Sequence, residues 1–131
     1  NMMTDPIADM LTRIRNAGLS KRANVIIPFS KVKRAVLEIM RKEGYIGEIT
    51  EEVEGVKKNL RAVLKYDGRM PAIRSIKRES KPGRRVYCKS ENIPIVLNGH
   101  GLAILSTPKG MMAGKDAKRA KLGGELICTI Y

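Results

Sequence analysis

The chain has very few aromatic side chains: no tryptophan, one phenylalanine and four tyrosines among 131 residues. A platform of several stacked aromatic rings, which many proteins use to bind single-stranded nucleic acid, is therefore excluded. Hydrophobic residues still make up 43% of the sequence, so we expect a folded protein with an aliphatic core. At this length the chain can bury one core or two small ones.

Side chains that carry catalysis or bind metals are also scarce. The single histidine, His100, lies between two glycines with no acid beside it, and we interpret it as structural. The two cysteines, Cys88 and Cys128, form no CxxC pair, so reduced thiols are favoured over a disulfide or metal ligands. No nucleophile elbow and no P-loop motif occurs. We predict no metal and no cofactor, and we favour a binding protein over an enzyme.

Long apolar runs are missing as well. No stretch approaches the ~20 residues that a helix needs to cross a bilayer. The first residues lack the basic-then-apolar order of a signal peptide. Together with the expected reduced thiols, this pattern predicts a cytoplasmic protein.

Negative charge is in short supply, because 26 Lys and Arg face 13 Asp and Glu, a net charge of +13. Such an excess favours a polyanionic partner, most often nucleic acid, over a merely soluble basic protein. Residues 1–66 hold 13 basic and 8 acidic side chains, and residues 67–131 hold 13 and 5. The second half is therefore predicted to be the binding half.

The first helix is signalled at both ends. Thr4 or Asp5 can cap it, and Pro6 suits the first helical position. Apolar residues then recur every three or four positions up to Gly18, which we expect to end the helix as its C-terminal glycine.

Four further elements are predicted in the first half. Residues 25–28 read as a short strand, and Ser30 caps a second amphipathic helix. Residues 45–53 and 59–66 alternate as the two strands of a hairpin. The order helix, strand, helix, strand, strand predicts a sandwich of two helices on a small sheet.

A turn-rich segment, residues 67–71, is the expected boundary between an N-terminal domain, 1–66, and a C-terminal domain, 67–131. In the second domain, Pro82-Gly83 indicates a type II turn, and residues 115–122 indicate a short basic helix. The expected strands are residues 73–77, 85–89, 102–105 and 126–130. The fold class is therefore α+β, with a mostly β C-terminal domain.

Cations gather in the middle of the second half. Six basic residues and one acid lie between Arg74 and Arg85, in the pattern of a phosphate-contacting surface. Tyr87 follows this cluster and either stacks on an exposed base or packs in the core; the sequence leaves both open. The basic ends of the second predicted helix suit a solvated face or an RNA-facing one.

The segment Ser106-Thr107-Pro108-Lys109-Gly110 follows an apolar run and is expected to form a compact loop. Hydroxyls donate and accept hydrogen bonds, lysine adds charge, and glycine permits close backbone approach. Folded RNA offers 2′-hydroxyls in a wide minor groove, which such a loop can contact. The segment is therefore a candidate for contact with a sugar–phosphate surface.

Several motifs in a fixed order resemble the bacterial ribosomal protein S-eight family, the eighth protein of the small subunit. The resemblance covers essentially the whole chain. Its motifs are residues 4–17 (TDPIADMLTRIRNA), 80–83 (SKPG), 85–87 (RVY), 96–99 (VLNG), 104–107 (ILST) and 123–125 (GGE).

The resemblance implies a fold of two small α/β domains and a primary RNA-binding function. The implied ligand is the central domain of small-subunit ribosomal RNA, which such a protein helps to organise into the platform. The implied protein neighbours are ribosomal proteins S-five and S-twelve. The alternative is a free repressor that binds the messenger RNA of a ribosomal-protein operon.

The resemblance also suggests which residues contact RNA. The hydroxyl-rich loop would approach the minor groove, Tyr87 a base or sugar, and Glu125 would accept hydrogen bonds from base or amide donors. Lys31 and Lys57 are weaker candidates for a second, N-terminal contact. The predicted RNA-binding residues are Ser106, Thr107, Lys109, Gly110, Tyr87, Gly124, Glu125, Lys81, Arg85, Lys31 and Lys57.

Two positions depart from the family pattern. Pro108 stands where a serine or threonine is usual, so a hydroxyl and a backbone N–H are both missing. Residues 112–114 replace the usual capping threonine and acid, so we expect the short helix that starts near Lys115 to be frayed.

Overall fold

The computed structural model describes residues 5–131. They form two compact units, Pro6–Arg74 (the N-terminal unit) and Asp5 with Ser75–Tyr131 (the C-terminal unit). The N-terminal unit thus continues past residue 66. It does so through a two-stranded ribbon of β4 (Tyr66–Asp67) and β5 (Met70–Pro71).

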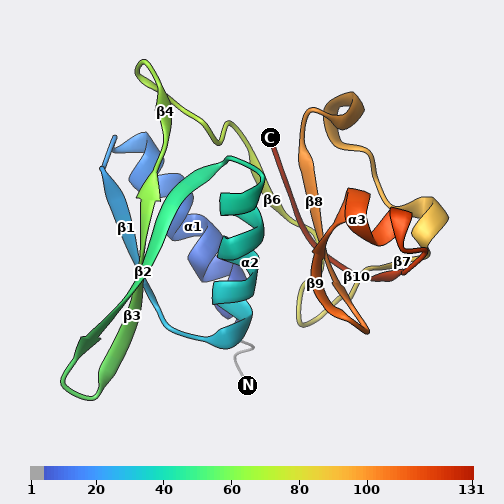
Figure 1. Ribbon diagram of the computed structural model, residues 1–131, viewed down its shortest axis with the longest axis horizontal. Coiled ribbons are helices and arrows are strands. Elements are labelled where there is room, and N and C mark those ends of the chain that lie inside the picture. Colours follow the sequence, from blue (N-terminus) through green and yellow to red (C-terminus); the bar gives the residue numbers. More distant parts are fainter. Residues whose placement is uncertain (1–4) are drawn as a thin grey trace. The chain divides into compact units, whose positions relative to one another are not determined.

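The N-terminal unit has the predicted order α1 (Pro6–Leu19), β1 (Asn24–Pro28), α2 (Lys31–Lys42), β2 (Ile46–Glu54) and β3 (Lys57–Leu64). The three strands form an antiparallel sheet in the order β1-β3-β2, on which both helices pack (Figure 1). The aliphatic core lies between these two layers. Its fully buried side chains include Met10, Leu11, Ile27, Val36, Leu37, Met40 and Leu60.

The helix ends in this unit follow local chemistry, with one correction. The Ser30 hydroxyl accepts a hydrogen bond from the Lys33 N–H (3.1 Å), which confirms the predicted cap of α2. Gly18 does not end α1: it is buried inside the helix, and Lys21 takes the positive φ (54°) instead. A Cβ at Gly18 would lie 3.5 Å from Pro71, an ordinary contact, so packing does not require glycine there. The predicted cap Thr4 lies outside the described residues.

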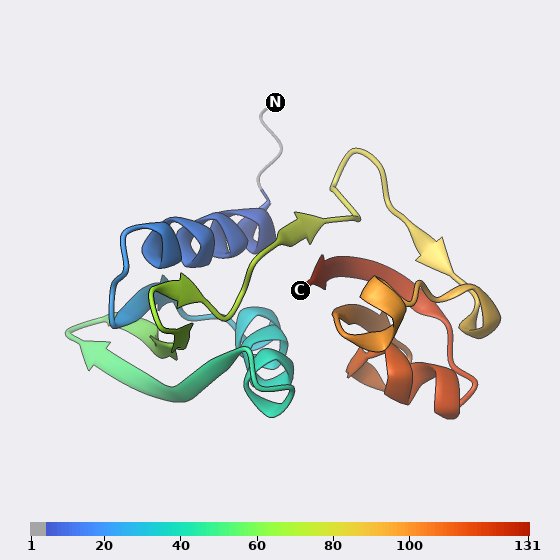
Figure 2. The same ribbon diagram turned by 90° about the horizontal axis from the view of Figure 1, so that it is seen from above.

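The C-terminal unit is mostly β, as predicted. Its strands are β6 (Ile76–Arg78), β7 (Tyr87–Cys88), β8 (Leu102–Thr107), β9 (Gly110–Ala113) and β10 (Gly124–Ile130). They form one antiparallel sheet in the order β6-β10-β8-β9, and β7 also pairs with β10. Helix α3 (Gly114–Arg119) packs on β8, and two 3-10 turns precede β8: Ser90–Asn92 and Val96–Gly99. Figure 2 shows β10, in dark red, running to the C-terminus.

A small aliphatic core holds this unit together. One of its clusters consists of Ile93, Ala103, Leu105, Ala117 and Leu126, and Ile104 and Ile130 are also fully buried in this unit. Helix α3 starts beside this cluster with no side-chain cap at Ala113, and the expected fraying stays a prediction.

The turn before β7 differs from the prediction. Lys81 and Arg84 exchange two backbone hydrogen bonds (3.0 and 2.9 Å), but Gly83 does not have the positive φ that a type II turn requires.

Both cysteines are free thiols, and burial raises the pKa of Cys128 to about 12. Of the helices within residues 5–131, none combines the length and apolarity needed to span a membrane.

Candidate nucleic-acid interface

Strand register places three predicted residues in one line across the C-terminal sheet. Glu125 on β10 pairs with Tyr87 on β7 and with Ser106 on β8. Directly paired residues of adjacent strands project from the same face of a sheet. We call these three residues the polar row. Tyr87 is 71% exposed, so the interpretation that packs it in the core is wrong.

The predicted 106–110 loop is a tight hairpin. Ser106 and Thr107 end β8, and Gly110 begins β9, so only Pro108 and Lys109 form the turn. The Thr107 hydroxyl accepts a hydrogen bond from the Lys109 N–H (3.1 Å) and donates one to the Gly110 carbonyl (2.8 Å). Thr107 is 8% exposed, so its hydroxyl shapes the turn from within.

Pro108 fits this turn well. Its ring fixes φ near the value that the first turn position needs, and the hairpin uses the N–H of Lys109 rather than one at residue 108. Gly110 has a φ of 104°, a conformation that residues with a side chain rarely adopt. The turn is therefore built by its own sequence, and Lys109 is exposed at its tip.

Ser106 differs from its neighbour Thr107. It is half-buried, and its hydroxyl has no hydrogen-bond partner within residues 5–131. Of the two adjacent hydroxyls, the one available to a ligand is therefore that of Ser106.

The Glu125 carboxylate has two side-chain partners in its own unit. Its Oε2 accepts hydrogen bonds from the Ser80 hydroxyl (2.5 Å) and from Arg85 Nη1 (3.1 Å). The preceding Gly124 lies so close to β8 that a Cβ there would overlap the Ser106 carbonyl. Sequence reasoning missed Ser80 as a site residue; its place just before the Pro-Gly turn was the available signal.

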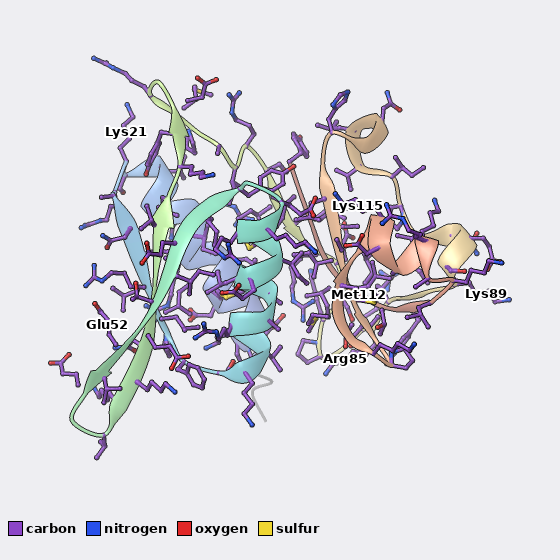
Figure 3. The ribbon with its side chains drawn as sticks, viewed as in Figure 1. Lys21, Glu52, Arg85, Lys89, Met112 and Lys115 are labelled. Atoms are coloured by element: carbon purple, nitrogen blue, oxygen red, sulfur yellow. The ribbon has the colours of Figure 1, made fainter. Side chains whose placement is uncertain are left out.

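The predicted basic cluster of residues 74–85 does not stay together. Arg78 is nearly buried, with its side chain 11% exposed, and binds Asp5 (3.0 Å) and the Ile127 carbonyl (2.7 Å). Arg74 belongs to the N-terminal unit and donates to the Pro71 carbonyl. Five exposed cations remain close to the polar row, either because they are near Tyr87 in the sequence or because they lie in the turn after Ser106. They are Lys81, Arg84, Arg85, Lys89 and Lys109. Figure 3 labels Arg85 and Lys89.

The expected charge difference between the halves also disappears. Pro6–Arg74 holds 15 basic and 8 acidic side chains, a net charge of +7, and the C-terminal unit holds 11 and 5, a net charge of +6. The reason is that the two arginines at positions 69 and 74 fall in the N-terminal unit. Net charge therefore does not distinguish a binding unit here.

Lys31 and Lys57 are exposed and belong to the N-terminal unit, whereas the other predicted residues belong to the C-terminal unit. Lys31 begins α2 and Lys57 begins β3. Their neighbours in sequence meet, because the Phe29 N–H donates to the Lys58 carbonyl and Lys58 Nζ lies 4.1 Å from the Phe29 ring.

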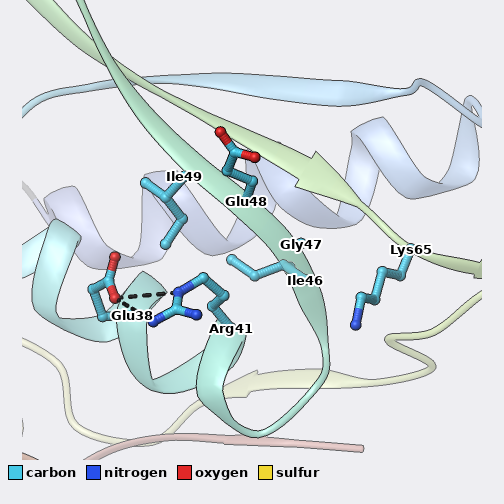
Figure 4. Close-up of a pocket in the computed structure, with 7 residues that line it drawn as sticks. All are labelled: Glu38, Arg41, Ile46, Gly47, Glu48, Ile49 and Lys65. Atoms are coloured by element: carbon cyan, nitrogen blue, oxygen red, sulfur yellow. Dashed lines mark hydrogen bonds and ion pairs between the residues drawn. The ribbon is translucent and has the colours of Figure 1, made fainter.

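A surface pocket of the N-terminal unit has mixed charge and contains none of the predicted residues (Figure 4). Its Glu38 and Arg41 side chains pair with each other at 3.0 Å. The lining residues are Glu38, Arg41, Ile46, Gly47, Glu48, Ile49 and Lys65. Across residues 5–131 we find no cluster of three His, Cys, Asp or Glu side chains that would hold a metal ion.

Comparison with known proteins gives one consistent family. The family model described as "Ribosomal protein S8" matches residues 5–131. The chain is 50% identical over 130 residues to "Small ribosomal subunit protein uS8" of Clostridium novyi, covering 99% of both chains. It is 53% identical over 132 residues to the protein of that name from Sorangium cellulosum, covering 99% of this chain and 100% of the relative.

Proposed function

The chain belongs to the ribosomal protein S8 family, and on that premise we propose that it is a structural component of the small ribosomal subunit that binds the RNA of this subunit. Its ligand is the central domain of that RNA, where it helps to assemble the platform. It works in the cytoplasm as part of the ribosome, next to ribosomal proteins S-five and S-twelve.

One observation carries the proposal: the polar row beside the 107–110 turn. The row combines an exposed aromatic ring, a carboxylate and a hydroxyl on one face of the sheet. Such a set suits folded RNA, where 2′-hydroxyls and base edges in the shallow groove offer donors and acceptors. Exposed lysines and arginines around it supply the phosphate contacts that set affinity.

Each predicted residue then has a distinct role. Ser106 and the backbone at Gly110 contact the groove, Tyr87 stacks on a base or sugar, and Glu125 accepts a hydrogen bond. Thr107 and Gly124 act indirectly, because the first closes the turn and the second lets β10 approach β8. Lys81, Arg85 and Lys109 contact phosphates, and Lys31 and Lys57 form a weaker second contact.

The proposal is tested by binding to an isolated central-domain RNA fragment and to an unrelated duplex of equal length. We expect a clear preference for the fragment, and an affinity for both that falls as salt rises. Equal affinity for the two RNAs would contradict the proposal.

Tyr87→Ala refines this test. Stacking of one base on an aromatic ring is worth about 1–3 kcal/mol, so the variant should lose about five- to 150-fold in affinity for the fragment. Because the ring is exposed, the fold should be unchanged. The matched control is Tyr131→Ala, which removes another exposed tyrosine of the same unit, away from the polar row.

The repressor alternative uses the same surface. It is distinguished from the ribosomal function by where the protein is found in the cell. A structural component co-sediments with small subunits in near-stoichiometric amounts. A protein found mainly in free complexes with messenger RNA would instead support the repressor.

A further inference from the structure

Ser80 is a completely buried hydroxyl at the edge of the polar row, with an exposed fraction of 0%. Its Oγ accepts a hydrogen bond from the Val86 N–H (3.1 Å) and lies 2.5 Å from Glu125 Oε2. A backbone N–H can only donate, and a hydroxyl has a single hydrogen. The Ser80 hydrogen is therefore directed at the Glu125 carboxylate.

This arrangement gives the two carboxylate oxygens of Glu125 different surroundings. Oε2 receives both Ser80 and Arg85, while Oε1 has no partner within residues 5–131. No buried side-chain oxygen in that range lacks a partner, so Oε1 is open to solvent. The side chain as a whole is 18% exposed and stands between Tyr87 and Ser106.

We propose that Ser80 is a positioning residue that turns the Glu125 carboxylate so that one oxygen faces the ligand as a fixed hydrogen-bond acceptor. The proposal rests on the proposed RNA-binding function. The group recognised is a single N–H or O–H donor of RNA, either the amino group of a base or a 2′-hydroxyl.

The consequence is selectivity rather than affinity. A carboxylate repels phosphate, so Glu125 costs binding energy wherever the backbone alone approaches the polar row. The cost is offset only by an RNA that presents a donor at that place. Ser80 keeps the acceptor aimed, and Arg85 balances part of its charge through the other oxygen.

The test is a double-mutant cycle of Ser80→Ala and Glu125→Ala, read out as the ratio of affinities for the central-domain fragment and the unrelated duplex. Ser80→Ala should lower this ratio about fivefold, the scale of one hydrogen bond, without changing the salt dependence. In the Glu125→Ala background it should lower the ratio no further. Additive effects would mean that Ser80 acts by a general structural route, and would overturn the proposal.

Thr129→Val is the matched control. Thr129 also lies on β10, and its hydroxyl donates to a carboxylate, Glu79 Oε2, at 2.9 Å. It is not part of the polar row, so its loss should leave the ratio unchanged. An equal fall in the ratio for Thr129→Val would overturn the proposal.

Glu125→Gln keeps the test decisive if Ser80→Ala does not fold. Ser80 and Arg85 are both donors toward this side chain, so the amide oxygen must face them and the NH₂ group must face the ligand. A base amino group would then meet a donor, and we expect the ratio to fall as far as in Glu125→Ala. A 2′-hydroxyl can also accept, so there the ratio should fall in part, because the charge-assisted bond to the carboxylate is lost. A glutamine variant that discriminates like the wild type would refute the aimed acceptor.

The source of the donor is found with modified fragments. At one position of the fragment, a 2′-deoxy sugar or a base analogue without its amino group should remove the donor. With that fragment, Glu125→Ala should no longer lower the ratio of affinities. If no such position exists, the inference fails. If the wild type shows no preference for the fragment at all, the proposed function itself fails, which is a different result.

Discussion

The two units carry nearly equal net charge, +7 and +6, yet they bury different polar groups. In the N-terminal unit the buried polar side chain is Lys33, whose ammonium group reaches the Pro28 carbonyl at 3.4 Å. In the C-terminal unit the buried polar side chains are two hydroxyls, Ser80 and Thr107, and each is bonded to a residue at the polar row or its turn. Charge therefore does not set the units apart; the placement of buried hydroxyls does.

The largest effect on stability is expected from replacing glycine by alanine, because a close strand contact in the C-terminal unit leaves no room for the added methyl group. Gly124→Ala would push a Cβ into the Ser106 carbonyl, which is backbone and cannot move without separating β10 from β8. We expect a loss of about 3 kcal/mol in the free energy of unfolding, measured by urea denaturation.

Gly18→Ala is its counterpart in the N-terminal unit. A Cβ there would meet Pro71 at an ordinary 3.5 Å, and alanine favours a helix over glycine by up to about 1 kcal/mol. This variant should be neutral or more stable. Equal destabilisation by both substitutions would break the contrast between a close strand contact and a loosely packed helix.

The next effect concerns the two adjacent hydroxyls. Thr107→Ala removes both hydrogen bonds that close the turn, so it should lower the melting temperature and weaken RNA binding by about 1–2 kcal/mol. Ser106→Ala should weaken binding by about 1 kcal/mol without altering the melting temperature, because its hydroxyl is not used internally.

Thr107→Ser is the control, since it keeps the hydroxyl and should restore most of both properties. A Thr107→Ala protein with normal stability and reduced binding would instead make Thr107 a direct contact, like Ser106.

A third prediction concerns the cap of α2. Ser30→Ala removes the hydrogen bond to the Lys33 N–H and should cost about 1 kcal/mol of stability. Because Ser30 belongs to the other unit, the ratio of affinities for the RNA fragment and the unrelated duplex should stay the same. A changed ratio, measured on the folded variant, would show that the two units are energetically coupled.

Most of the N-terminal unit could be predicted because its signals are local. The apolar stripe and Ser30 fix α2 within a few residues, and the alternation in β3 fixes its buried face. The end of α1 was predicted wrongly: Gly18 is buried inside the helix, and the positive φ falls at Lys21, where no glycine marks it.

The site was less predictable, because its chemistry depends on which partner each hydroxyl finds. From the sequence, Ser106 and Thr107 were predicted to have the same role. In the hairpin, the Thr107 hydroxyl is hydrogen-bonded within the turn, whereas the Ser106 hydroxyl has no partner within residues 5–131. Arg78 was predicted as a surface cation, but its side chain pairs with Asp5, which lies 73 positions away in the sequence. Strand register decides such outcomes, and register over that distance is not readable from one sequence.

The smallest effect is expected from the exposed acids of β2. Hydrogen bonds from Lys58 hold the pKa of Glu51 below its usual range, with help from Arg34, and Arg61 does the same for Glu52 at 2.7 Å. A carboxyl whose folded pKa is lowered stabilises the fold above its unfolded pKa, and this contribution is lost as pH falls through the folded value. Glu52→Gln should therefore flatten the fall in stability below about pH 4.5 relative to the wild type. Because these pairs are exposed, 1 M salt should erase the difference, and urea midpoints from pH 2 to 7 at low and high salt measure it. A difference that survives high salt would mean that the N-terminal unit, like the C-terminal one, depends on a polar contact shielded from water.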